Sequence, residues 1–148
     1  MSDKIRDNNI EKLMQLPCRI IDIFPERVPE RMAGRYSAAE QYYLSLPRLE
    51  VLRRKYADII IKLGCYRDIF ISTDHGETFA ELPSPEKTED IITACTGAKT
   101  LYFSVSGDEC LIVMDGCDTY MTVYASDEAL IGTLGKLASS AGLFIWEA

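Results

Sequence analysis

Few residues of this sequence have the type and spacing that chemistry requires. The only histidine, His75, stands between Asp74 and Gly76, where a carboxylate neighbour suits a general base or a metal ligand. Asp and Gly are also ordinary turn-forming residues, and no second ligand stands at a suitable spacing. We therefore interpret His75 as a polar residue at a hairpin tip. The sequence predicts no metal site and no cofactor.

The cysteines form neither a disulfide framework nor a zinc site, because they are odd in number and none belongs to a C-x-x-C pair. Each lies in or beside an apolar run, which is typical of small buried residues in a reducing compartment. We expect all five to be core residues; they are Cys18, Cys65, Cys95, Cys110 and Cys117.

Four acidic residues flank two predicted turns, and such oxygen ligands suit a hard cation. They are Asp108, Glu109, Asp115 and Asp118. Successive turns of a meander lie at opposite ends of the strands, so a strand length of about 17 Å separates the two pairs. We do not expect one shared cation site. The sequence also contains no EF-hand, Walker, G-x-S-x-G or G-x-G-x-x-G motif.

The charges are sorted along the chain. Residues 27–67 hold nine Lys/Arg against four Asp/Glu, a net charge of +5, whereas residues 68–148 hold three against fourteen, a net charge of −11. The calculated pI of about 4.7 argues against nucleic-acid binding, since that affinity comes mainly from neutralising phosphates. Such asymmetry is a clue to association rather than to fold.

The basic stretch supplies two candidate recognition surfaces. Arginines of the 25–36 loop suit a carboxylate or phosphate group of a small ligand; the candidate ligand-binding residues are Arg27, Arg31, Arg35 and Tyr36. Arginine and tyrosine are also enriched at protein interfaces; the candidate partner-binding residues are Tyr42, Tyr43, Arg48, Arg53 and Arg54. The alternative is a solvated basic helix face that pairs with the acidic half of the same molecule.

Two classes of function follow from these features. The first is a non-enzymatic interaction protein, either a homodimer or an adaptor or inhibitor. The second is a small enzyme or ligand-binding domain that recognises an anionic small molecule through the 27–36 loop. A deep pocket lined by Arg31, Arg35 or Tyr36 would favour the second class, and a flat surface there would favour the first.

Composition predicts one domain over residues 1–148, because 148 residues with 47% hydrophobic content can build one sizeable core. No apolar run approaches the roughly 18 residues that span a bilayer, and the first residues lack the apolar region of a signal peptide. We therefore expect a soluble cytoplasmic protein without membrane contact.

Residues 1–66 are expected to be mostly helical. The sequence predicts a short helix over 8–16, a strand over 20–24 and a loop over 25–36. A capping box at Ser37 and Glu40 starts a helix that runs to about Leu46. Pro47 opens the best-defined helix, which ends at Gly64 and has one apolar face made by Leu49, Leu52, Tyr56, Ile59, Ile60 and Leu63.

Residues 67–148 are expected to form an acidic sheet section. A hairpin over 68–82 precedes a helix that is capped by Ser84 and ends near Gly97. A meander follows, with strands over 101–105, 109–114 and 119–124. Ser126 caps a last helix, which ends at Gly142 before a closing strand over 143–146. If that strand lies beside the third meander strand, the two form a parallel, right-handed unit.

Strands 110–114 and 143–146 are apolar on both faces, so we expect both sides of the sheet to be covered there. Helices of the second section can cover one face and helix 47–64 the other; a subunit contact is the alternative. Gly132, Gly135 and Ser139 favour close approach of the last helix to its own sheet or to a partner helix. The predicted fold class is α+β: a mostly antiparallel sheet with helices packed on it.

Overall fold

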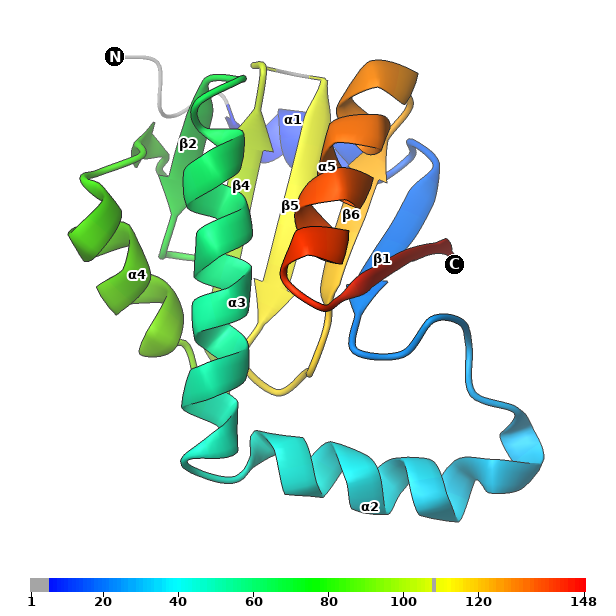
Figure 1. Cartoon of the computed structure of the whole chain (residues 1–148). Coiled ribbons are helices and arrows are strands. Elements are labelled where there is room, and N and C mark those ends of the chain that lie inside the picture. The colour runs from blue at the N-terminus through cyan, green and yellow to red at the C-terminus, as the bar shows by residue number, and fades with distance from the viewer. Residues whose placement is uncertain (1–5, 108) are drawn as a thin grey trace.

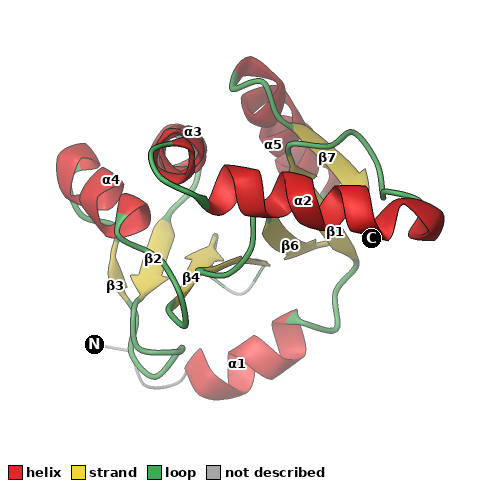
Figure 2. Cartoon of the chain, turned by 90° about the horizontal axis from the view of Figure 1, so that it is seen from below, coloured by secondary structure: helices red, strands yellow, loops and turns green. Residues whose placement is uncertain are grey.

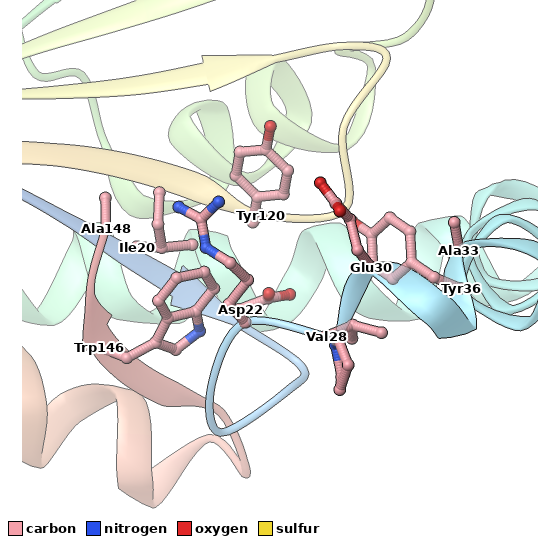
Figure 3. Close-up of a pocket in the computed structure, with 11 residues that line it drawn as sticks. Ile20, Asp22, Val28, Glu30, Ala33, Tyr36, Tyr120, Trp146 and Ala148 are labelled. Carbon is pink, nitrogen blue, oxygen red and sulfur yellow. The ribbon is translucent and has the colours of Figure 1, made fainter.

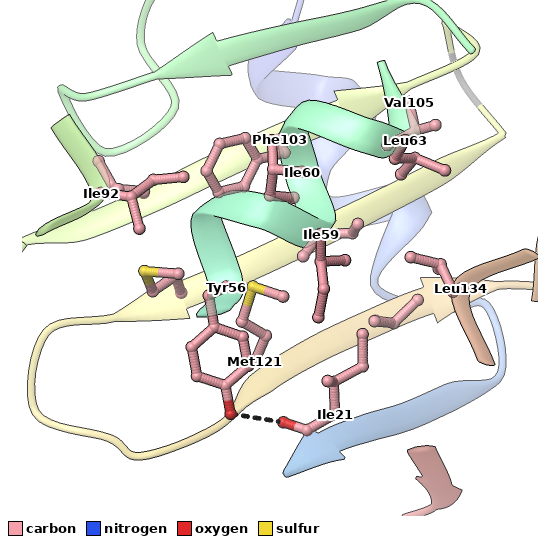
Figure 4. Packing of buried hydrophobic residues seen from close by; sticks show 14 of the residues in the cluster. Ile21, Tyr56, Ile59, Ile60, Leu63, Ile92, Phe103, Val105, Met121 and Leu134 are labelled. Atoms are coloured by element: carbon pink, nitrogen blue, oxygen red, sulfur yellow. Dashed lines mark hydrogen bonds between the residues drawn. The ribbon is translucent and has the colours of Figure 1, made fainter. Parts of the chain in front are cut away.

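The helix that the sequence predicts over residues 47–64 organises the fold. In the computed structural model, which describes residues 6–107 and 109–148, it is α3 (Arg48–Leu63). The six apolar residues of its predicted face are all buried, and Figure 4 shows how Ile59, Ile60 and Leu63 pack against the sheet. Burying each of these side chains contributes roughly 1.5–3 kcal/mol to the free energy of unfolding. Apolar residues therefore recur along the buried face of this helix, and that pattern predicted it.

The other helices are α1 (Arg6–Leu13), α2 (Ala33–Leu44), α4 (Pro85–Thr93) and α5 (Glu128–Ser140), with a 3-10 turn η2 (Glu30–Met32) before α2. The strands are β1 (Cys18–Asp22), β2 (Ile69–Ser72), β3 (Ala80–Glu81), β4 (Thr100–Val105), β5 (Cys110–Asp115), β6 (Met121–Ala125) and β7 (Phe144–Glu147). They form one antiparallel sheet in the order β3-β2-β4-β5-β6-β1-β7. The predicted α+β fold and the β4-β5-β6 meander are therefore confirmed.

The helices divide unequally between the two faces of the sheet (Figures 1 and 2). Helix α3 packs between α4 and α5 on one face, while α1 lies on the other face against β5, with Leu13 buried. The prediction that helix 47–64 and the later helices cover opposite faces is wrong. Hydrophobic periodicity shows that a helix has a buried face, but not which side of the sheet receives it.

Strand β1 lies between β6 and β7, although it is far from both in sequence. Both neighbours run antiparallel to β1, and Ile20 lies opposite Thr122 of β6 and Trp146 of β7. Strands β6 and β7 are consequently parallel to each other but not adjacent, and α5 crosses over β1 to join them. A parallel unit was expected only if β7 lay beside β6. Because β1 separates these two strands, they do not form that unit.

Strand β7 is an edge strand and is less covered than expected. Leu111 and Ile112 of β5 are fully buried on opposite faces of the sheet, as predicted for 110–114, whereas Phe144 of β7 is 45% exposed. On the α5 side, a Cβ at Gly135 would lie 3.5 Å from Ile145, and a Cβ at Gly132 would meet no atom within 4 Å. Of these two glycines, therefore, only Gly135 lies close to the chain's own sheet.

Helix α2 begins earlier than predicted. It starts at Ala33, so the pair Ser37 and Glu40 lies inside the helix and is not a capping box. None of the residues of α2 is buried, and Figure 2 shows the helix running across the end of the sheet. Ser84 does cap α4, whereas Asp127 rather than Ser126 caps α5. None of the helices in residues 6–107 and 109–148 combines the length and apolar character needed to cross a bilayer.

Candidate functional site

A pocket of about 360 Å³ opens at the end of the sheet where β1, β6 and β7 meet the start of α2. We call it the aromatic pocket; its lining residues include Ile20, Asp22, Arg27, Glu30, Tyr36, Tyr120 and Trp146 (Figure 3). Two of the four predicted ligand-binding residues, Arg27 and Tyr36, therefore line one cavity. The other two, Arg31 and Arg35, are exposed and do not line it.

Asp22 is the buried charge of the aromatic pocket. Its side chain ends β1, is 4% exposed, and accepts a hydrogen bond of 2.7 Å from the backbone N–H of Ile23. None of the ion pairs among residues 6–107 and 109–148 includes Asp22. Burial raises its pKa above the usual 3.8, the N–H groups of Ile23 and Phe24 oppose that shift, and Glu40 adds to it. Asp22 is thus a buried carboxylate with no ion-pair partner within the described part of the chain, although Arg27 lines the same pocket.

Three aromatic side chains from different elements surround this carboxylate. Tyr36 comes from α2, Tyr120 directly precedes β6, and Trp146 lies in β7. In Figure 3 the Asp22 carboxylate lies between the indole of Trp146 and the ring of Tyr36. Phe24 supports Tyr36 from outside, with ring centroids 5.7 Å apart. Trp146 Nε1 is buried near the Asp22 carboxylate but makes no hydrogen bond of ordinary geometry.

Further carboxylates make the surroundings of the pocket electronegative. Burial, followed by the charge of Asp118, raises the pKa of Tyr120 to about 12. Burial and Glu40 likewise raise the pKa of Tyr36. Both phenols are therefore neutral at physiological pH, and a positive charge in the pocket would lower the energy of the site.

Sequence reasoning missed Asp22, Tyr120 and Trp146. They lie more than twenty residues apart in the chain, and only the pairing of β1 with both β6 and β7 brings them together. The available signal was an acidic residue within an apolar strand, Ile20–Phe24, together with the single tryptophan of the chain.

The predicted partner-binding residues divide into exposed and buried positions. Tyr42, Tyr43 and Arg48 cluster where α2 meets α3: the tyrosine rings are 5.1 Å apart and edge-to-face, and the Arg48 guanidinium lies 3.8 Å from the Tyr42 ring centroid. Leu46 and Val51 beside them are 74% and 55% exposed. We call these five residues the arm surface. A small apolar groove of about 190 Å³ lies at its edge.

The two remaining arginines face inward or toward the same molecule. Arg53 is fully buried, so it lies outside any exposed surface; its Nη2 donates to the carbonyl of Gly116 at 3.1 Å. Arg54 is exposed and pairs with Glu50 at 3.6 Å and with Glu89 of α4 at 3.4 Å. At Arg54, therefore, the basic section pairs with the acidic section of the same chain.

The remaining candidates do not form a reactive centre. His75 is exposed at the hairpin turn with φ of 61°. Asp108 lies outside the described residues, and Glu109 pairs with Arg67 at 3.7 Å. Within the described residues, no group of three or more His, Cys, Asp or Glu is placed to hold a metal ion.

The cysteines differ from one another in burial. Cys95 and Cys110 are buried core residues, as predicted, whereas Cys18 is half-buried and lies outside the core cluster. Cys65 and Cys117 are exposed, so the prediction that all five belong to the core is wrong for these two. Burial raises the pKa of Cys110 to about 12, which makes its thiol unreactive near neutral pH.

A second hollow, of about 700 Å³, lies between α4 and the β4 side of the sheet. Its charged lining side chains, Glu86, Lys87, Asp90 and Lys99, are all exposed. It therefore lacks the buried charge and the aromatic walls of the aromatic pocket. Comparisons with protein-family models, with curated proteins and with solved structures find no match to this chain.

Proposed function

We propose that this chain is a non-enzymatic protein-interaction domain that self-associates through the arm surface. The observation that supports this proposal is the exposure of apolar side chains around α2. Five of the eight large hydrophobic side chains that are exposed among the described residues lie between positions 32 and 51: Met32, Tyr42, Tyr43, Leu46 and Val51. Concentrated apolar exposure of this kind is typical of interaction sites.

Charge complementarity favours a second copy of the chain as the partner. The arm surface carries Arg48, and Lys55 lines the adjoining groove; neither takes part in a described ion pair. The acidic section of the chain has a net charge of −11, and described ion pairs occupy only four of its carboxylates. In a two-fold dimer each arm surface would contact the acidic section of the other copy, giving two equivalent contacts.

Sedimentation of the purified chain over a dilution series tests the proposal. The double substitution Leu46→Ser with Val51→Ser should weaken the dimer at least about 100-fold, because four apolar side chains per dimer lose their burial. Both positions are mostly exposed within one copy, so the fold should remain intact. Tyr66→Ser is the matched control, because Tyr66 is 69% exposed beyond the other end of α3.

The salt dependence separates apolar burial from charge. Exposed ion pairs contribute roughly 0–1 kcal/mol each, so a dimer based on the arm surface should persist at moderate salt concentration. A monomer at every concentration, or equal weakening by the double substitution and by Tyr66→Ser, would refute the proposal.

A further inference from the structure

The aromatic pocket has the size and the enclosed charge of a small-molecule site. Its volume of about 360 Å³ lies within the range of ligand pockets, roughly 300–1,000 Å³. It is built separately from the arm surface: of the residues that line it, only Ala33 and Tyr36 belong to α2. Because Tyr36 lines it, this pocket supports a ligand-binding role, the second class of function that the sequence left open, beside self-association through the arm surface.

The charge in this pocket differs from the one that the sequence suggested. The arginines of the 27–36 loop favoured an anionic ligand, but Arg27 is exposed at the pocket and the buried group is the carboxylate of Asp22. A buried carboxylate without a counter-ion costs free energy that a bound cation offsets. An anion would instead add a further negative charge near the carboxylates of Asp22, Glu30 and Asp118.

The walls of the pocket indicate what kind of cation fits. Aromatic faces attract organic ammonium groups through cation–π interactions. Tyr36, Tyr120 and Trp146 offer three rings around Asp22 (Figure 3). A divalent metal ion would instead need several oxygen ligands, and the described residues contain no such group. An ammonium group with N–H donors would satisfy both the carboxylate and the rings.

We propose that the aromatic pocket binds a small organic amine in its ammonium form, with Asp22 as the counter-ion and Tyr36, Tyr120 and Trp146 as the enclosing rings. The ammonium donates hydrogen bonds to the Asp22 carboxylate, which also accepts one from the backbone N–H of Ile23 and lies near the N–H groups of Phe24 and Trp146. Arg27, which is exposed and also lines the pocket, can pair with a ligand that carries an acidic group beside its ammonium group.

Trp146 makes the test direct, because it is the only tryptophan in the chain and it lines the pocket. Its fluorescence and its indole N–H resonance should respond to a bound ligand. The matched probes are benzylamine, benzyl alcohol and benzoate, which share a ring but differ in charge. Benzylamine should produce a saturable change with a Kd of about 1 mM, as expected for a fragment of this size, and the other two should not.

Two carboxylate substitutions show whether Asp22 is responsible. Asp22→Asn should weaken benzylamine binding by at least about tenfold, since it removes the counter-ion and keeps a side chain of the same shape. Asp58→Asn, on the exposed side of α3, should leave binding unchanged. If Asp22→Asn disturbs the fold, Tyr120→Leu provides a second variant that keeps the carboxylate and removes one ring; it too should weaken binding.

A second amine tests whether the pocket recognises the ammonium group rather than the benzyl ring. Nα-acetyl-lysine methylamide presents the same ammonium group as a lysine of a partner protein, and binding of this probe or of benzylamine supports the proposal. Binding of benzoate in preference to benzylamine would overturn it. The absence of any response to either amine, or an unchanged affinity in Asp22→Asn, would also overturn it.

Discussion

The buried arginine on α3 allows a quantitative test of how this core is stabilised. Arg53 is fully buried, and its Nε and Nη1 have no hydrogen-bond partner. Each unsatisfied buried donor costs about 1–3 kcal/mol, and burial lowers the pKa of this guanidinium by disfavouring its charge. The one hydrogen bond from Nη2 to the Gly116 carbonyl contributes only about 1.5–3 kcal/mol to the free energy of unfolding.

Methionine matches the length of the arginine stem without the buried charge. Arg53→Met should therefore raise the free energy of unfolding by about 1–3 kcal/mol, in line with other replacements of buried charges by apolar groups. Arg53→Ala should lower it by about 2–5 kcal/mol, because alanine leaves a cavity. Arg54→Met is the matched exposed control, and its effect should stay below about 1 kcal/mol, since its ion pairs are solvent-exposed.

Urea unfolding followed by circular dichroism measures these differences. A clear loss of stability in Arg53→Met would refute the reasoning. It would show that the hydrogen bond to Gly116, in the turn between β5 and β6, stabilises the fold by more free energy than the desolvation of the guanidinium costs.

Two further predictions concern the hairpin turn and the thiols. Hydrogen bonds from Thr78 and Ser72 lower the pKa of Asp74 from 3.8 to about 2, so their stabilisation is present above 3.8 and is lost as the pH falls toward 2. Because Asp74 is exposed and solvent screens its interactions, Asp74→Ala should lower the free energy of unfolding by only about 1 kcal/mol at neutral pH, and urea unfolding should show this difference disappearing in acid. A maleimide should label two thiols of the folded protein rapidly, Cys65 and Cys117, and all five only after denaturation; rapid labelling of a buried thiol would contradict the structure.

The sequence by itself determined the elements whose local signals are strong. The apolar face of α3 repeats at helical spacing, and Ser84 followed by Pro85 marks the start of α4. The turns of the meander are too short to join parallel strands, so its strands pair antiparallel. Ambiguous local signals gave wrong predictions. The capping pattern at Ser37 predicted a helix start, but Ser37 lies inside α2.

Only the tertiary structure decided which distant residues meet. The insertion of β1 between β6 and β7 brings Asp22, Tyr120 and Trp146 to one pocket, and the packing of α3 against the sheet buries Arg53 while leaving Arg54 exposed. Strand pairing across such separations depends on the summed burial of the whole core, which no local pattern encodes. The sequence therefore identified which residues were available for function, and the strand order determined which of them form a site.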